Sequence, residues 1–283
     1  MGSIAKRLLP RSVFSALSRS KLELRSKSSV ARIAISQWLA TVEPLSERSA
    51  QILKDLRSDG YARISSPEFL KLADYAAAEY LVGVTSQKKL HLRGTSDLCG
   101  NWQYRLSFND ANLHKFFFNE DIHAALRSYA GRLFFRESPL LEVFIYNGSD
   151  EVTRDVATYA AAFHTDYFRQ INLMLLLSDI PENNTCTEYA QGSNNRNVFI
   201  EGGKVDYPRS NQLIKGGGYH VVKLTGRRGD VVLMDTTGFH RACLKIGTTR
   251  QLLTTILNPG FPFIGYGESV SKPAGIAAHT IKY

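Results

Sequence analysis

Cysteine is scarce in this chain of 283 residues. Its three cysteines, Cys99, Cys186 and Cys243, lie far apart in the sequence, so they form neither a disulfide framework nor the closely spaced pairs of a zinc clip. We therefore expect a reducing compartment, with Cys186 and Cys243 as buried, unreactive thiols in β segments. Long apolar runs are missing too, since none approaches the roughly 20 residues that a membrane-spanning helix needs.

Acidic residues are nearly absent from the start of the chain. Residues 1–42 hold eight lysines and arginines and a single acid, a net charge of +7, whereas the remaining 241 residues have a net charge of only +2. The sequence therefore predicts a basic N-terminal arm over residues 1–42 and a near-neutral domain over residues 43–283. We expect no nucleic-acid partner.

Three interpretations of the basic arm stay open. It is a solvated arm that packs on the domain, a segment that contacts an anionic membrane or substrate through residues 1–35, or an organellar import signal. Pro10 disfavours the import signal because it interrupts any single long amphipathic helix. We expect a cytoplasmic protein, with attachment to a membrane surface as an alternative and organellar import as the less favoured one.

The first part of the domain has helical patterns. Ser46, Ser66 and Asn119 each precede an apolar repeat with helical spacing and can cap a helix. The expected elements are a helix over residues 43–59, a strand over 61–64, a helix over 66–83 and a helix from 119 to about 133. Residues 84–115 are polar and irregular, which predicts a loop-rich segment facing the substrate.

The pattern changes after Pro139, where short β-branched and aromatic runs alternate with turn residues. The expected strands cover residues 140–146, 157–164, 170–178, 186–190, 197–200, 219–224, 230–235 and 250–257. Eight short, closely spaced strands are typical of a sandwich or a jelly roll. The sequence thus predicts a mainly β fold with flanking helices and a β core at about residues 140–262.

Two histidines and an aspartate are the candidates for chemistry. His164 and Asp166 are two positions apart, so on a strand they point to the same face, and His240 follows a strong strand at Gly229–Asp235. Two imidazoles and one carboxylate on one side of a metal ion leave its other side open, which suits ferrous iron. A lone histidine or an HxD pair is more often structural, so the hypothesis depends on the combination. Arg250, ten residues after His240, offers a fork of donors to an anion.

The same stretches resemble a known family. His164-Thr165-Asp166 is followed by an apolar strand at residues 173–177 and an acidic turn at 178–186, and later by the Gly229–His240 segment and Arg250. This order is similar to that of the phytanoyl-CoA dioxygenase family of Fe(II)/2-oxoglutarate-dependent oxygenases. The likeness extends over most of residues 50–262. The chain departs from the family at three turn positions: Thr185 replaces a glycine, and Gln191 and Asn194 replace a proline and a histidine.

The resemblance implies a double-stranded β-helix (cupin-like jelly roll) that uses Fe(II), 2-oxoglutarate and O2. His164, Asp166 and His240 would be the catalytic metal ligands, and Arg250 would pair with the distal carboxylate of 2-oxoglutarate. Asn172, which shares the parity of Asp166 if the strand is unbroken, and Tyr146, at the end of an earlier strand, are further candidates for binding this co-substrate. Their structural alternatives are a polar edge residue and a core tyrosine.

The resemblance also implies a reaction. It is hydroxylation of an unactivated C–H bond in a small or lipid-linked organic substrate, with release of succinate and CO2. Asp166 favours hydroxylation over halogenation because halogenating relatives have a small residue at that place. Desaturation or ring closure by the same oxidant stays open, as does a non-catalytic jelly-roll module that binds a metal or ligand.

Overall fold

The computed structural model describes residues 44–81, 102–107, 112–113, 119–130, 135–147, 162–166, 170–196, 205, 208–243, 245 and 247–259, with single positions at 20, 24, 28, 31 and 35. For strands β2 and β3 the description covers the backbone. Three predicted segments lie wholly or partly outside the described residues. They are most of the basic arm, the strand at 197–200, and residues 157–161 of the strand at 157–164.

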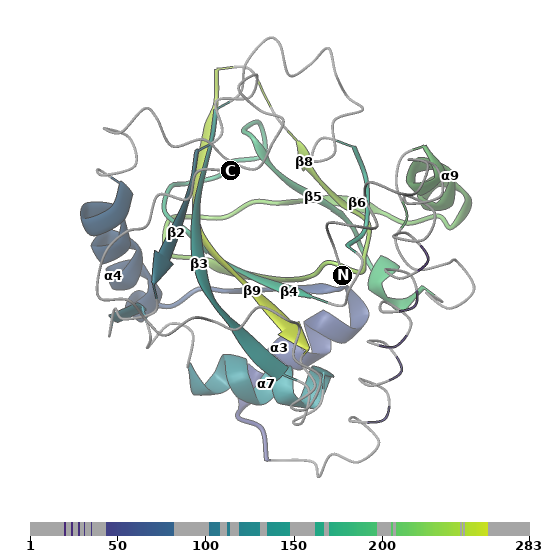
Figure 1. Ribbon diagram of the computed structural model, residues 1–283, viewed down its shortest axis with the longest axis horizontal. Helices are drawn as coiled ribbons and strands as arrows, with labels where there is room; N and C mark the ends of the chain where they lie inside the picture. The colour runs from purple at the N-terminus through teal and green to yellow at the C-terminus, as the bar shows by residue number, and fades with distance from the viewer. Residues whose placement is uncertain are drawn as a thin grey trace, which may run out of the picture.

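Two antiparallel sheets form the centre of the protein (Figure 1). Within the described residues the larger sheet has six strands in the order β1 (Tyr61–Ile64), β7 (Val231–Asp235), β4 (Ile171–Leu176), β9 (Thr249–Pro259), β3 (Phe135–Asn147) and β2 (Trp102–Ser107). The smaller sheet has three, in the order β6 (Val221–Leu224), β5 (Cys186–Ala190) and β8 (His240–Cys243). The chain alternates between the sheets, so that β7 and β9 belong to the larger sheet and β8, between them in sequence, to the smaller one. The predicted mainly β class with flanking helices is confirmed.

Two of the helices begin where a capping side chain accepts from their first amide groups. The Ser49 amide donates to Ser46 Oγ at 3.1 Å, and the Ile122 amide donates to Asn119 Oδ1 at 3.2 Å. The described helices are α3 (Glu47–Ser58), α4 (Pro67–Ala76) with its π-helical extension η1 (Ala77–Leu81), α7 (Glu120–Ala130), the 3-10 turn η3 (Ser193–Asn195) and α9 (Arg209–Gly216). Gly60, at φ 83°, follows α3 directly and lets the chain reverse into β1.

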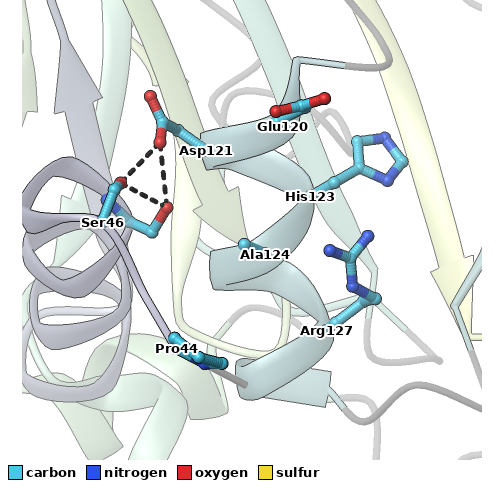
Figure 2. Close-up of a pocket in the computed structure, with 8 residues that line it drawn as sticks. Pro44, Ser46, Glu120, Asp121, His123, Ala124 and Arg127 are labelled. Atoms are coloured by element: carbon cyan, nitrogen blue, oxygen red, sulfur yellow. Dashed lines mark hydrogen bonds between the residues drawn. The ribbon is translucent and has the colours of Figure 1, made fainter.

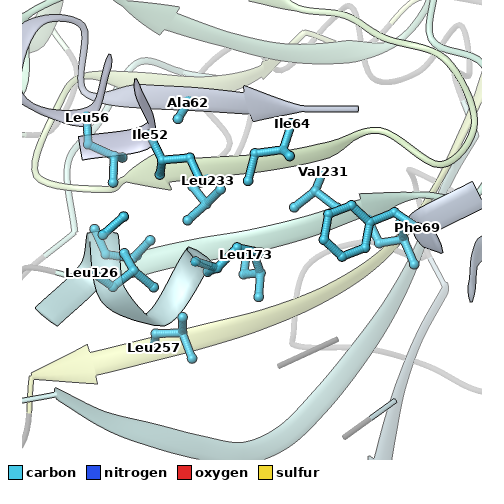
Figure 3. Close-up of a cluster of buried hydrophobic side chains, with 14 of the residues drawn as sticks. Ile52, Leu56, Ala62, Ile64, Phe69, Leu126, Leu173, Val231, Leu233 and Leu257 are labelled. Carbon is cyan, nitrogen blue, oxygen red and sulfur yellow. The ribbon is translucent and has the colours of Figure 1, made fainter. Parts of the chain in front are cut away.

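Helices α3, α4 and α7 cover the outer face of the larger sheet. Apolar side chains from all three meet alternate residues of the sheet strands, as Figure 3 shows for Leu56, Phe69, Leu126, Leu173 and Leu233. Because strand residues alternate between faces, the intervening residues of the same strands face the smaller sheet and form a second apolar cluster. Helix α9 lies at the opposite side of the molecule (Figure 1), where Ile214 joins Phe239 and Phe163 in a third cluster.

The structure corrects the prediction for residues 84–115 and adds two elements that were not expected. Strand β2 lies within the segment 84–115 that was expected to be irregular, and it pairs with β3 from Trp102↔Ile145 to Ser107↔Leu140. Strand β8 and helix α9 were not predicted at all. The strand expected at 157–164 is represented among the described residues by one isolated bridge at His164. Strands β2 and β8 depend on pairing and helix α9 depends on packing with distant residues, and local sequence patterns do not report such contacts. No helix within the described part of the chain is long and apolar enough to cross a membrane.

A buried polar network joins the helical layer to the end of β7. The Tyr129 hydroxyl of α7 donates to Asp235 Oδ2 at 2.6 Å and accepts from Asn194 Nδ2 at 3.0 Å. The other carboxylate oxygen of Asp235 accepts from the Thr237 amide at 2.9 Å and from its hydroxyl at 2.7 Å. The network therefore fixes the turn that leads from β7 into β8.

Replacing Tyr129 with phenylalanine should lower the free energy of unfolding by about 1–3 kcal/mol, because the buried Asp235 carboxylate loses a donor. Denaturant titration followed by circular dichroism measures this change. The matched control is Tyr219→Phe, since the hydroxyl of Tyr219 has no partner among the described residues; its change should stay under about 0.5 kcal/mol. Equal effects of the two substitutions would contradict the role of the network.

Candidate metal centre

His164 and His240 are joined through their backbones. The His164 amide donates to the His240 carbonyl at 3.0 Å, and the His240 amide donates to the His164 carbonyl at 3.0 Å. This exchange forms an isolated antiparallel bridge, in which the two side chains lie on the same face. Their rings are 4.4 Å apart between centroids. Two residues separated by 76 positions in the sequence are thus held side by side.

Asp166 reaches the same place through the next hydrogen bond along this segment. Its amide donates to the Thr236 carbonyl at 3.0 Å, in the turn that precedes β8. One ligand atom from each of His164, Asp166 and His240 lies within 4.8 Å of the others, with both histidines buried and the aspartate half-buried. Ligand atoms on one side of an ion, at about 2.0–2.2 Å from it, lie about 3 Å apart, so these three side chains would move closer together around an ion that they bind.

Both imidazoles are oriented by backbone carbonyl groups. His164 Nδ1 lies 2.8 Å from the Ala162 carbonyl oxygen, and His240 Nδ1 lies 3.0 Å from the Gly238 carbonyl oxygen. A carbonyl oxygen only accepts, so Nδ1 carries the proton in both rings and Nε2 carries the lone pair. Metal-binding histidines commonly have such a carbonyl partner, which fixes the tautomer and the ring orientation. The arrangement fits a divalent ion that prefers nitrogen and carboxylate ligands, as ferrous iron does.

Arg241 ties the two histidine-bearing segments to each other and to β5. Arg241, next to His240, donates to Glu188 Oε2 through Nε at 2.7 Å, and its Nη2 lies 2.6 Å from the same oxygen. The guanidinium carbon also lies 4.4 Å from the ring centre of Phe163, next to His164. These contacts therefore link β5, β8 and the segment 162–166. The sequence reasoning missed this pair because Glu188 and Arg241 meet only through the pairing of β5 with β8.

Arg250 crosses the space between the two sheets. It lies on β9 of the larger sheet, is only 4% exposed, and its Nη1 donates at 2.5 Å to the Thr187 hydroxyl on β5 of the smaller sheet. A guanidinium is too costly to bury without hydrogen-bonded or charged partners. Its position suits the binding of a carboxylate between the sheets.

Asn172 and Tyr146 lie on strands on either side of β9. Asn172 is opposite Met234 in the register of β4 with β7, and Met234 belongs to the cluster between the sheets, so Asn172 shares that inner face. Its Oδ1 is buried and has no hydrogen-bond partner among the described residues. The backbone of Tyr146 is directly opposite that of Arg250 in the register of β3 with β9.

The parity argument for Asn172 was wrong although its result agrees with the structure. Residues 165 and 166 are outside any strand, and β4 begins only at Ile171, so no unbroken strand joins Asp166 to Asn172. Asn172 faces the inside because of its own pairing within the larger sheet. Of the other predicted site residues, His164, Asp166 and His240 meet at one place, and Arg250 reaches from one sheet to the other.

Comparison with known proteins now identifies the family. Residues 110–243 match the family model of phytanoyl-CoA dioxygenase (PhyH). The chain carries a domain of the phytanoyl-CoA dioxygenase family. This match includes the segments of His164, Asp166 and His240, and Arg250 follows it in β9. The match and the donor set support the predicted cofactors. No curated protein sequence matches the chain.

Solved structures of similar fold place the phytanoyl-CoA dioxygenase-like domain among jelly-roll proteins. The non-haem alpha-ketoglutarate-dependent epimerase SnoN from nogalamycin biosynthesis has a TM-score of 0.54 at 15% identity, covering 81% of this chain and 94% of SnoN. Its complex with Fe3+, alpha ketoglutarate and nogalamycin RO has a TM-score of 0.53 at 14% identity, with the same coverage of 81% and 94%. EctD from S. alaskensis, in its apoform, has a TM-score of 0.51 at 13% identity, covering 78% of this chain and 79% of EctD. The predicted double-stranded β-helix is confirmed.

A separate surface pocket has no part in this site. Figure 2 shows it between the start of α3 and helix α7, lined by Ser46, Asp121, His123 and Arg127 among others. The Asp121 carboxylate is already bound by the hydroxyl of Ser46 at 2.5 Å and that of Ser49 at 3.1 Å. None of the three candidate metal ligands lines this pocket, and we assign it no chemistry.

The turn before His240 requires glycine at position 238. A Cβ atom there would collide with the Tyr189 hydroxyl and would lie 2.9 Å from Ser193 Oγ. The Tyr189 hydroxyl donates to the Asp235 carbonyl at 2.9 Å, and Ser193 Oγ accepts from the Phe239 amide at 2.8 Å. These bonds hold the turn close to Tyr189 of β5 and to Ser193. Because Gly238 has no side chain, the turn can approach them this closely, and this approach sets the position of His240.

Gly238→Ala should therefore destabilise the protein by about 1–3 kcal/mol through overpacking and should weaken metal binding, since the turn carries His240. Thermal unfolding measured with and without Mn(II) gives both quantities. Gly216→Ala is the matched control because a Cβ atom at Gly216 has nothing within 4 Å. A Gly238→Ala protein with the stability and metal affinity of the control would refute the packing argument.

Proposed function

We propose that this protein is an Fe(II)- and 2-oxoglutarate-dependent dioxygenase that hydroxylates an unactivated C–H bond of a small or lipid-linked organic substrate. The observation that carries the proposal is the convergence of His164, Asp166 and His240 within 4.8 Å in a domain of the phytanoyl-CoA dioxygenase family. Three protein ligands on one side of an ion leave positions for a chelating co-substrate and for oxygen.

The side chains of this chain would hold and orient the reactants. When bound, ferrous iron and 2-oxoglutarate supply the oxidation of a C–H bond by dioxygen, with release of succinate and CO2. His164 and His240 each present Nε2 because Nδ1 donates to a backbone carbonyl, and Asp166 adds a negative charge that compensates the charge of the ion. Arg241, which pairs with Glu188 and packs against the ring of Phe163, holds the segments that carry both histidines in place.

The space between the sheets would take the co-substrate. Arg250 presents a buried guanidinium there, and pairing with the distal carboxylate of 2-oxoglutarate would compensate its desolvation. Thr187 already holds one end of this guanidinium and thus restricts its orientation. Asn172 faces the space between the sheets with an amide whose Nδ2 can donate to a carboxylate, and Tyr146 is opposite Arg250 in register, so both stay our candidates for further co-substrate contacts.

The direct test is turnover of 2-oxoglutarate to succinate by the reconstituted protein with Fe(II) and a panel of candidate substrates. The oxygenase proposal predicts succinate formation that depends on Fe(II), is stimulated by the right substrate and is absent from a His240→Ala protein. A protein that binds Fe(II) and 2-oxoglutarate but forms no succinate with any substrate or on prolonged incubation alone would instead be a binding module.

The product mass separates hydroxylation from other outcomes of the same oxidant. A gain of one oxygen atom supports hydroxylation, and a loss of two hydrogen atoms indicates desaturation or ring closure. Since SnoN is an epimerase of this fold, a product of unchanged mass must also be examined for inverted stereochemistry. Either of the last two results would replace hydroxylase by another activity at the same metal centre.

The basic arm supports an anionic or membrane-associated substrate as part of this proposal. Residues 1–42 carry a net charge of +7, and clustered cations of this kind attract anionic lipid surfaces. The full chain should bind phosphatidylserine vesicles in low salt, and deletion of residues 1–35 should remove the binding. Equal binding by the full and shortened chains would assign it to another surface.

A further inference from the structure

Two of the three cysteines meet across the smaller sheet, although they are 57 positions apart in the sequence. Cys186 begins β5 and Cys243 ends β8, and the two are directly opposite in the antiparallel register. Both are free thiols, Cys186 fully buried and Cys243 half-buried. The expectation of two unreactive, buried thiols does not describe this arrangement.

The spacing of paired strands already suits a disulfide. Directly opposite residues of an antiparallel pair have Cα atoms about 4.5–5.5 Å apart, which lies within the range of about 4.4–6.8 Å found for disulfides. The two side chains lie close enough that each shifts the pKa of the other. A bond between them therefore needs a small approach of neighbouring strands and no rearrangement of the fold.

We propose that Cys186 and Cys243 form a redox-active dithiol that a hydroperoxide converts reversibly into a disulfide. The two thiols have different surroundings, which gives each a separate role. The hydrogen bond from Cys186 lowers the pKa of Cys243 to about 7 against the opposing effect of burial, whereas the same contact and burial raise the pKa of Cys186. Cys243, the more exposed of the two, is the attacking thiolate, and Cys186 is the resolving thiol.

The reaction balances in two steps. The Cys243 sulfur attacks one oxygen of the hydroperoxide, the O–O bond breaks, and the other oxygen leaves with the thiol proton, as water from hydrogen peroxide or as an alcohol from an organic hydroperoxide, which gives a sulfenic acid at Cys243. The Cys186 sulfur then attacks the Cys243 sulfur, the S–O bond breaks, and the hydroxyl leaves as water with the Cys186 proton. The dithiol loses two electrons, and the peroxide gains them.

The disulfide would form next to the proposed co-substrate site. Cys186 directly precedes Thr187, whose hydroxyl holds Arg250, and the Arg250 charge acts on the Cys186 thiol. Cys243 lies three residues after His240 on the same strand. Closer approach of β5 and β8 at this end would shift Thr187 relative to Arg250. Oxidation should thus weaken 2-oxoglutarate binding several-fold and reduction should restore it, a consequence that rests on the proposed function, whereas disulfide formation itself does not.

The test uses the full chain with Cys99→Ser, so that only this pair remains, after removal of metal ions with a chelator. One equivalent of hydrogen peroxide should lower the intact mass by two hydrogen atoms per chain. Dithiothreitol should reverse the change, and peptide mapping should find Cys186 joined to Cys243. Formation of sulfinic acid, of disulfides between chains, or of no product at all would overturn the proposal.

Single substitutions test the separate roles of the two thiols. Cys186→Ser should leave a sulfenic acid at Cys243 that dimedone traps, and Cys243→Ser should leave Cys186 unreactive to one equivalent of peroxide. Reaction at Cys186 in the Cys243→Ser protein would overturn the assignment of the attacking thiolate. Because the mass measurement on the Cys99→Ser protein decides the proposal by itself, poor folding of either single variant does not remove the test.

Discussion

Replacing Asp166 with alanine is expected to lower turnover of 2-oxoglutarate by about a thousandfold or more. The substitution removes the only carboxylate of the proposed ligand set and with it several kcal/mol of interaction with the ion, and about 4 kcal/mol corresponds to a thousandfold. Asp166 is half-buried, so its truncation leaves the packed core intact. Fe(II) affinity measured by anaerobic calorimetry and succinate formation should fall together.

Glu182→Ala is the matched control for Asp166→Ala. Glu182 is an exposed carboxylate in the turn after β4, and the described residues give it no side-chain hydrogen bond. Its removal changes the net charge by the same amount and should leave both metal affinity and turnover unchanged. If the Asp166→Ala protein kept the metal affinity of the control, Asp166 would not be a ligand.

Replacing Arg250 should mainly raise the KM for 2-oxoglutarate. Arg250→Gln removes a buried cation that faces the space between the sheets, and a lost charge-assisted pair of about 2–3 kcal/mol corresponds to roughly 30- to 150-fold in affinity. Arg250→Lys keeps the charge but loses the two-pronged geometry, so it should show a smaller rise. Steady-state kinetics with varied 2-oxoglutarate measures both effects.

The metal site provides the internal control for this second prediction. Fe(II) affinity should be the same in the wild type and in both Arg250 variants, because Arg250 is not a proposed ligand. Arg57→Gln, on the exposed side of α3, should leave KM unchanged. A wild-type KM in the Arg250→Gln protein would show that the distal carboxylate binds elsewhere.

Features set by neighbouring residues could be predicted from the sequence. The caps at Ser46 and Asn119 depend on residues three positions away, and strand β7 has a dense apolar run of its own. The ligand candidates could also be recognised because His164 and Asp166 are two positions apart and His240 follows a recognisable Gly-Asp strand. The family resemblance then supplied the link between the two segments.

Features set by distant pairing could not be predicted. Strand β2 exists through its register with β3, and the bridge between His164 and His240 joins residues that no local pattern connects. The same limit hid the Glu188–Arg241 ion pair and the contact of Cys186 with Cys243, both of which arise from the pairing of β5 with β8. The inward position of Asn172 was predicted for the wrong reason. The prediction assumed an unbroken strand from Asp166, whereas the position results from the pairing of β4 with β7.

The coordination of a single ion by His164, Asp166 and His240 is tested most directly by crystallography of the full chain with Mn(II) in place of Fe(II). The account predicts one anomalous peak per chain between β8 and the segment 162–166, with both histidine Nε2 atoms and an Asp166 oxygen at about 2.0–2.3 Å. A peak bound by other residues, or an Asp166 carboxylate turned away from an ion held by the two histidines, would contradict it.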